Sequence, residues 1–201
     1  MKLYYTPGAC SLAPHLLLEH LELPYEAVPV KLDAHTYPGG DYYQINPKGS
    51  VPALELDGGE ILTENAVILQ YLADQKPEAR SLPQSGSLER YRALEWLNYI
   101  ATELHKNFGP LFNSRAPEEY KTIAKENIGK RFEFVAKRLG AQSFLAGDHF
   151  SAPDAYLFVM LTWADKMKID TSRWPELGRY AERIKSLPAA QRALKAEGLS
   201  L

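Results

Sequence analysis

The chain has 201 residues, enough to bury a sizeable core in one domain or two small ones. Its formal net charge of -2 excludes the electrostatic attraction by which basic proteins bind nucleic acids and anionic membranes. A single cysteine excludes an internal disulfide, and the sequence shows neither a membrane-spanning run nor a signal peptide, so we expect a cytoplasmic protein.

Strand-like and helical patterns alternate over the first 75 residues. Alternating apolar residues indicate strands, and apolar residues spaced three and four apart indicate helices. The order is strand, helix, strand, then strand, strand, helix, which predicts an α/β domain. The predicted strands are 2–5, 25–29, 53–56 and 60–62, and the predicted helices are 11–21 and 64–75.

The only cysteine, Cys10, follows the first predicted strand and precedes the first predicted helix. Free amide groups and the positive end of the helix dipole favour a thiolate there, which is nucleophilic near neutral pH. Ala13 takes the place of the second cysteine in a C-x-x-C pair, so Cys10 acts as a single thiol or through a hydrogen bond. The alternative is that Cys10 has a structural role, as a small apolar side chain buried in the core.

The segment NPKGSVPAL at 46–54 places Pro52 at the start of a strand, and LTENA at 62–66 places Glu64 and Asn65 at the start of a helix. Proline has no amide hydrogen, so Pro52 predicts a turn with a cis bond after Val51. The backbone of Val51 then binds an extended peptide, while Glu64 binds an ammonium group and the helix start near Asn65 binds a carboxylate. These residues fit a site for a small zwitterionic peptide, and equally a structural turn followed by a capped helix.

A polar segment with two prolines, 76–86, is typical of a linker, and the chain after it is helical in pattern. We predict a first domain at 1–77, a linker at 78–86 and an all-α domain at 87–201. Ser151 and Asp154 have the spacing of a capping box before a nearly apolar helix, a feature that we assign to stability. The predicted helices are 87–108, 117–139, 154–166, 175–186 and 188–197.

Asn98, Thr102 and His105 follow i, i+4, i+7 spacing and are predicted to share one stripe of an otherwise apolar helix. A polar stripe of this kind faces water or a binding site. With an ordinary pKa of about 6.5, a histidine can donate a hydrogen bond to a sulfur or accept a proton from a thiol. The alternative for His105 is a surface or packing role.

Motifs from both halves of the chain resemble one known family. NPKGSVPAL and LTEN, together with the order of elements, resemble the cytosolic glutathione transferases over the whole chain. YTPGACSL at 5–12 and WLNYIATELHK at 96–106 resemble the bacterial beta class of that family. The resemblance implies a thioredoxin-like first domain that binds glutathione, an all-helical second domain, an electrophile between the two, and a homodimer.

The resemblance also implies roles for individual residues. In the beta class, residues matching Cys10 and His105 lie beside the glutathione sulfur, and the cysteine can form a mixed disulfide with it. Ser11 is a natural helix cap as well as a possible donor to the sulfur. His35 stands about where the beta class has a lysine that binds the glycyl carboxylate, and Asn65 where family members often have serine. The expected glutathione-binding residues, some of which act across the dimer interface, are Val51, Pro52, Glu64, Asn65, His35, Asn98, Thr102 and Lys106.

The function expected from this resemblance is conjugation of the glutathione thiolate to hydrophobic electrophiles, with glutathione as co-substrate and no metal or other cofactor. Two other functions stay open, namely glutathione-dependent thiol-disulfide exchange or peroxide reduction through Cys10, and non-catalytic binding of hydrophobic compounds. Aromatic residues of the second domain are candidates for lining the electrophile pocket, and these are Phe108, Phe112, Tyr156 and Trp163.

Overall fold

The computed structural model describes residues 1–200 and divides into two compact units. The first unit joins Met1–Leu82 to the C-terminal segment that begins at Leu187, and the second unit is Pro83–Ser186. The sequence pattern, by contrast, groups the last helix with the helical domain. This helix lies in the first unit because it packs on the first helix of the chain, a long-range contact that helical periodicity does not reveal.

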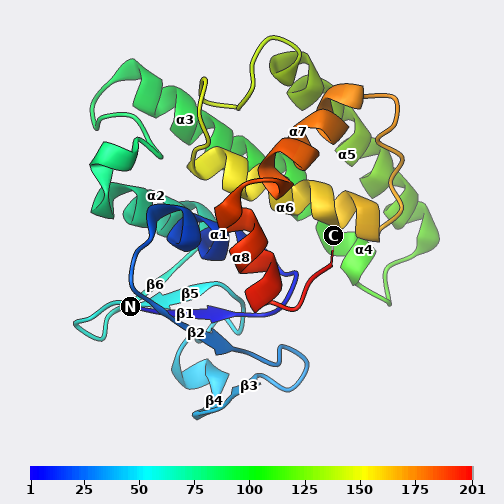
Figure 1. The fold of residues 1–201 in the computed structure, drawn as a ribbon. Helices are drawn as coiled ribbons and strands as arrows, with labels where there is room; N and C mark the ends of the chain where they lie inside the picture. Colours follow the sequence, from blue (N-terminus) through cyan, green and yellow to red (C-terminus); the bar gives the residue numbers. More distant parts are fainter. Residues whose placement is uncertain (201) are drawn as a thin grey trace. The chain divides into compact units, whose positions relative to one another are not determined.

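The first unit contains a four-stranded sheet built from β1 (Lys2–Tyr5), β2 (Glu26–Pro29), β5 (Ala53–Glu55) and β6 (Ile61–Thr63). The strand order is β2-β1-β5-β6 (Figure 1). Strand β1 pairs in parallel with β2 and antiparallel with β5, and β5 pairs antiparallel with β6. A parallel pair needs a crossover connection, whereas an antiparallel pair needs only a short turn. The mixed sheet confirms the predicted α/β class and its thioredoxin-like order of elements.

Helix α1 (Leu12–Leu21), the crossover between β1 and β2, packs against α2 (Asn65–Gln75) and α8 (Pro188–Ala196). Every residue from Leu12 to Leu18 is buried, including His15. A helix that is apolar all round is stable only when its neighbours cover it, and α2 and α8 contribute that cover.

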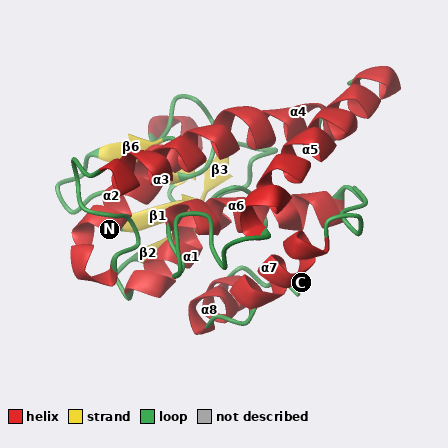
Figure 2. Ribbon diagram, turned by 90° about the horizontal axis from the view of Figure 1, so that it is seen from above, coloured by secondary structure: helices red, strands yellow, loops and turns green. Residues whose placement is uncertain are grey.

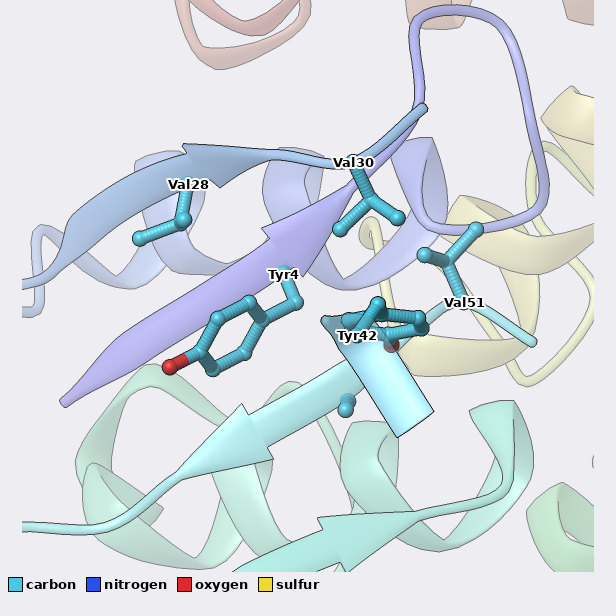
Figure 3. Close-up of a cluster of buried hydrophobic side chains, with 6 residues drawn as sticks. Tyr4, Val28, Val30, Tyr42 and Val51 are labelled. Carbon is cyan, nitrogen blue, oxygen red and sulfur yellow. The ribbon is translucent and has the colours of Figure 1, made fainter. Parts of the chain in front are cut away.

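A small hairpin and a 3-10 helix follow β2, and the sequence pattern does not predict them. The strands β3 (Thr36–Tyr37) and β4 (Gly40–Asp41) are too short to show alternation, and the 3-10 helix is Tyr42–Gln44. This segment contributes a fully buried tyrosine to an apolar cluster on the main sheet (Figure 3). The buried residues of the cluster are Tyr4, Val28, Val30, Tyr42, Val51 and Ala53.

The second unit consists of helices and connecting loops (Figure 2). The helix predicted at 87–108 is a continuous run of three segments, namely α3 (Leu88–Tyr99), a π-helix at Ile100–His105 and α4 (Lys106–Phe112). The helices α5 (Glu118–Leu139), α6 (Ala152–Lys166) and α7 (Pro175–Lys185) begin and end within two residues of the prediction. Among residues 1–200, no helix is both long and apolar enough to cross a membrane.

Asp154, near the start of α6, is fully buried. Its Oδ2 accepts hydrogen bonds from the amide of Ser151 at 2.9 Å and from the Ser151 hydroxyl, which confirms the predicted capping box. Its Oδ1 accepts from the amide of Leu145 and from the hydroxyl of Tyr180, both at 2.8 Å. Burial raises the pKa of this carboxyl group even though these hydrogen bonds oppose the shift. One carboxyl group thus joins α6, α7 and the loop before α6.

We predict that Asp154→Ala lowers the free energy of unfolding by about 3–5 kcal/mol, because it leaves buried donors on Leu145, Ser151 and Tyr180 without an acceptor. Urea denaturation followed by circular dichroism measures the change. Asp165→Ala, at an exposed position near the end of the same helix, is the control and changes stability by less than about 0.5 kcal/mol. An equally small effect of Asp154→Ala would contradict the stabilising role.

Candidate functional site

Cys10 lies in the loop between β1 and α1, and its side chain is 9% exposed. The Ser11 hydroxyl closes this loop, because it accepts from the amide of Thr6 at 3.2 Å and donates to the Thr6 carbonyl at 3.3 Å. The Cys10 thiol donates to the carbonyl of Val51 at 3.3 Å. The fold therefore brings together Cys10 and Val51, two of the predicted site residues.

The thiolate predicted at Cys10 is wrong for the protein without ligand. Burial raises the pKa of the Cys10 thiol to about 12, although the amides of Cys10 and Ser11 act in the opposite direction. The negative charge of Glu64 raises this pKa further. A helix terminus stabilises an anion by only about 0.3–1 kcal/mol, which is less than the cost of removing a thiolate from water. Cys10 is therefore a neutral thiol near neutral pH.

The prediction that the Ser11 side chain caps α1 is wrong, whereas its donation to a sulfur stays a prediction. Helix α1 begins at Leu12, and the Ser11 side chain makes no capping hydrogen bond. The side chain is fully buried and its hydroxyl bonds to the backbone of Thr6. Ser11 therefore shapes the Cys10 loop through its side chain.

We predict that Cys10 of the ligand-free protein reacts slowly with iodoacetamide, because with a pKa of about 12 only about one thiol in ten thousand is ionised at about pH 8. The rate should rise about tenfold for each step of one pH unit in this range, since the thiolate is the nucleophile. Mass spectrometry of the intact protein over time measures the rate, with free glutathione in the same solution as control. Alkylation of Cys10 as fast as that of glutathione would contradict the neutral thiol.

Val51 and Pro52 precede β5, and the peptide bond between them is cis, as predicted. The turn before them is held at the carbonyl of Ser50, which accepts from the hydroxyl of Tyr42 at 2.9 Å and from the side-chain amide of Asn46 at 2.6 Å. Among residues 1–200, the hydrogen bonds of this turn leave the amide of Val51 without an acceptor. Figure 3 shows the side chains of Tyr42 and Val51 close together in the cluster on the sheet.

Glu64 and Asn65 mark the start of α2. Glu64 has a φ of 72°, a left-handed conformation that is unfavourable for a residue with a side chain. Its carboxylate and the hydroxyl of Thr63 both accept from Nζ of Lys48. Asn65 is 7% exposed, and neither its Nδ2 nor its Oδ1 has a hydrogen-bond partner among residues 1–200. A buried amide without partners is costly, which keeps Asn65 a candidate for binding a ligand.

His35 lies in the segment before β3, with a φ of 49°. Its ring packs on that of Tyr43, with the centroids 4.5 Å apart, and its Nδ1 is buried without a partner among residues 1–200. The ring also lies close to Gly49, since a Cβ added there would stand 3.1 Å from it. The structure therefore places this histidine next to the segment that carries Lys48.

His105 packs against α6 in the second unit. Its Nδ1 is 2.6 Å from the hydroxyl of Tyr156, and its ring meets that of Trp163 edge-on, with centroids 4.9 Å apart. The ring of Trp163 in turn contacts the rings of Phe108 and Phe112. The four predicted aromatic residues thus form one cluster with His105, in which Phe112 is 46% exposed and Phe108 is fully buried.

The prediction that His105 shares one polar stripe with Asn98 and Thr102 does not match their burial. Asn98, Thr102 and Lys106 are exposed, whereas His105 is half-buried. The stretch that joins them includes the π-helix, whose wider turn departs from the α-helical spacing on which the predicted stripe rests. The ring of His105 packs on Tyr156 and Trp163, whereas the Thr102 hydroxyl donates to the Asn98 carbonyl at 3.0 Å.

A buried pair that sequence analysis did not single out lies next to the Cys10 loop. Nδ1 of His15 is 2.7 Å from Oε1 of Glu197, and both side chains are completely buried. The sequence signal for His15 is a histidine between apolar residues in a helix that is buried all along its first two turns. Glu197 is 182 residues away and gives no such signal.

These groups offer hydrogen bonds and charges of both signs to a ligand. Lys48 and Glu64 supply one charge of each sign, Asn65 supplies a buried amide, and Cys10 supplies a neutral thiol. Within residues 1–200, no three His, Cys, Asp or Glu side chains gather into a group able to hold a metal ion.

Two family models match the chain. The model described as glutathione S-transferase, N-terminal domain, matches residues 1–74, and the model described as glutathione S-transferase, C-terminal domain, matches residues 99–188. Glutathione S-transferase GstA of Escherichia coli O157:H7 is 44% identical over 200 residues, which cover 99% of this chain and 100% of the relative.

Two solved structures are similar over the full length of both chains. A sphingomonad glutathione S-transferase complexed with glutathione is 46% identical, with a TM-score of 0.96 and 100% of each chain covered. A bacterial beta class glutathione S-transferase from Sphingomonas chungbukensis has the same identity of 46%, TM-score of 0.96 and coverage of 100%.

Proposed function

This chain belongs to the glutathione S-transferase family, and we propose that its first compact unit binds glutathione along the segment from Val51 to Asn65. Its activity is conjugation, in which the glutathione sulfur attacks an electrophile and forms a thioether. We propose hydrophobic electrophiles as the second substrate, because the aromatic cluster around Trp163 offers partly exposed apolar surface in the second unit.

The buried, unpartnered amide of Asn65 carries this proposal. One end of glutathione bears an ammonium group and a carboxylate on the same carbon. The start of α2 offers backbone amides and the positive end of its dipole to the carboxylate, and Nδ2 of Asn65 adds a donor. Glu64 accepts from the ammonium group, whereas in the ligand-free protein it accepts from Lys48. The zwitterionic end of glutathione thus matches the charges at this helix start.

The middle of glutathione lies along Val51, whose amide and carbonyl pair with it as neighbouring strands pair, with Pro52 setting the turn. Because Cys10 Sγ lies 3.3 Å from the Val51 carbonyl, this pairing brings the glutathione sulfur close to Cys10. Cys10 then acts as a neutral hydrogen-bond donor to the sulfur anion, and the amide of Ser11 is a second donor. His35 binds the glycyl carboxylate at the other end of the peptide.

The family resemblance supports His105 as a donor to the glutathione sulfur anion, and the Tyr156 hydroxyl at its Nδ1 holds the ring in one orientation. Lowering the pKa of a thiol by two units requires about 2.7 kcal/mol of differential stabilisation. One or two charge-assisted hydrogen bonds, worth about 1.5–3 kcal/mol each, are enough to supply this.

We also propose a homodimer. Asn98, Thr102 and Lys106 are exposed on one side of their helix, where they are available to glutathione bound by the partner subunit. The family resemblance supports this assignment. The proposed location is the cytoplasm, since a protein with one unpaired cysteine and a glutathione substrate suits a reducing compartment.

We predict that Asn65→Ala raises the KM for glutathione by about 10- to 100-fold, because it removes a hydrogen bond to the carboxylate. The free energy of unfolding should stay the same or increase, since the buried amide makes no hydrogen bonds in the ligand-free protein. Asn65→Ser is the matched control, because it keeps a donor and should raise KM less. Steady-state kinetics and urea denaturation measure the two effects, and an unchanged KM in Asn65→Ala would argue against glutathione at this helix start.

We predict that Cys10→Ala retains conjugation, with a rate lowered by less than about tenfold, because a neutral thiol contributes one ordinary hydrogen bond. The measurement is the glutathione-dependent initial rate with an activated chloronitroaromatic compound under reducing conditions. A much larger loss would favour thiol-disulfide exchange through Cys10 as the main chemistry. A negligible rate in the unmodified protein would overturn the conjugation reaction with such electrophiles.

A further inference from the structure

The side chain of Lys48 extends between the two ends of the proposed glutathione site. Its Nζ donates to the hydroxyl of Thr63 at 2.7 Å and to the carboxylate of Glu64. Its main chain lies at the other end, because a Cβ added to the next residue, Gly49, would stand 3.1 Å from the ring of His35. The lysine therefore starts beside the histidine assigned to the glycyl carboxylate and reaches the glutamate assigned to the ammonium group.

We propose that Lys48 changes its partner when glutathione binds, leaving Glu64 to the ammonium group of the peptide and moving to the glycyl carboxylate beside His35. The inference rests on the proposed function, since it takes the two ends of glutathione to lie at Glu64 and His35. It makes Lys48 the residue that selects a peptide with a free carboxylate at the glycyl end.

The charges of the ligand favour this exchange. Glutathione carries one ammonium group and two carboxylates, and the helix start at Asn65 binds one of the carboxylates in the proposed function. If Lys48 stayed in place, two cations would share the carboxylate of Glu64 and repel each other. The glycyl carboxylate would meanwhile be left with the ring of His35. After the exchange, the ammonium group faces Glu64 and the glycyl carboxylate faces a full positive charge.

The contact between Lys48 and Glu64 is easily broken. Their side chains are 50% and 68% exposed, so water and salt screen the attraction between them. The four-carbon stem of a lysine is flexible, so its ammonium group can leave one partner for another. Only a small free energy separates the two positions, and a ligand that offers a carboxylate to one of them shifts the equilibrium.

The main chain that carries this side chain is held by a buried asparagine. The amide of Lys48 donates to Oδ1 of Asn46 at 3.1 Å, and Nδ2 of Asn46 donates to the Ser50 carbonyl at 2.6 Å. The amide of Gly49 donates to the Asn46 carbonyl at 2.8 Å, and Asn46 is buried. The exchange therefore needs a movement of the lysine side chain alone, about a fixed turn.

The test compares two ligands, glutathione and its monoethyl ester at the glycyl carboxyl group, by isothermal titration calorimetry. The ester keeps the ammonium end but has no charge at the glycyl end, so the ratio of the two dissociation constants measures the interaction with that carboxylate. Competition between Lys48 and the ammonium group is common to both ligands and cancels in this ratio. The variant is Lys48→Met. The matched control is Lys2→Met, because Lys2, at the start of β1, forms another partly exposed ion pair in the same unit, with Glu55.

The unmodified protein should bind the ester about tenfold more weakly than glutathione, and Lys48→Met should reduce this ratio by about fivefold. Lys48→Met should also bind the ester about two- to fivefold more tightly than the unmodified protein does, because Glu64 has lost a competing cation. Lys2→Met should leave both dissociation constants unchanged, and Lys48→Arg, which keeps the charge, should preserve most of the ratio. An unchanged ratio in Lys48→Met, or an ester that binds this variant no more tightly, would overturn the proposal.

Failure of the proposed function gives a different result. If glutathione does not bind at the start of α2, Asn65→Ala and Lys48→Met both leave its dissociation constant unchanged. If only the exchange is wrong, Asn65→Ala weakens the binding of both ligands by the same factor, whereas Lys48→Met leaves their ratio as it is in the unmodified protein.

Discussion

The hydrogen bond from the Cys10 thiol to the Val51 carbonyl joins two loops that are 41 residues apart in the chain. The Ser11 hydroxyl closes the first loop, and the buried carboxylate of Glu197 ties it to the C-terminal segment. The hydroxyl of Tyr42, a side chain of the apolar cluster on the sheet, holds the second loop. The relative position of these two loops therefore depends on the packing of the first unit, from the sheet to the segment after helix α8.

Burial raises the pKa of the Cys10 thiol, and the nearby backbone amides lower it. The effect of burial is the larger of the two. The amides at the start of α1 lower the pKa of the thiol, but the loss of water around the sulfur raises it by more. A neutral Cys10 suits a site in which the anion belongs to glutathione, because a second thiolate at the same place would repel it. In the proposed function, Cys10 is therefore a hydrogen-bond donor and the reactive sulfur belongs to glutathione.

Asn65 and His15 both have buried polar atoms without a hydrogen-bond partner among residues 1–200, but their surroundings differ. Asn65 stands at the start of a helix beside a lysine and glutamate pair, so its unpartnered amide matches the carboxylate of a zwitterionic ligand. His15 uses one nitrogen for Glu197 and leaves the other among the rings of Tyr5 and Tyr25. The motif around Asn65 is visible in the sequence because its residues are neighbours in the chain. The pairing of His15 is not visible there, because its partner lies at the far end.

The sequence by itself determined the order and bounds of the main elements, since prolines, glycines and capping residues interrupt regular apolar patterns. Strand β1 and the first turn of α7 begin where these patterns predict. Only the tertiary structure decided the neutral state of Cys10, the packing of His105 on α6, and the place of Glu197 beside the Cys10 loop. Each of these depends on burial or on distances between residues remote in the chain, and the local spacing of residue types carries no information about either.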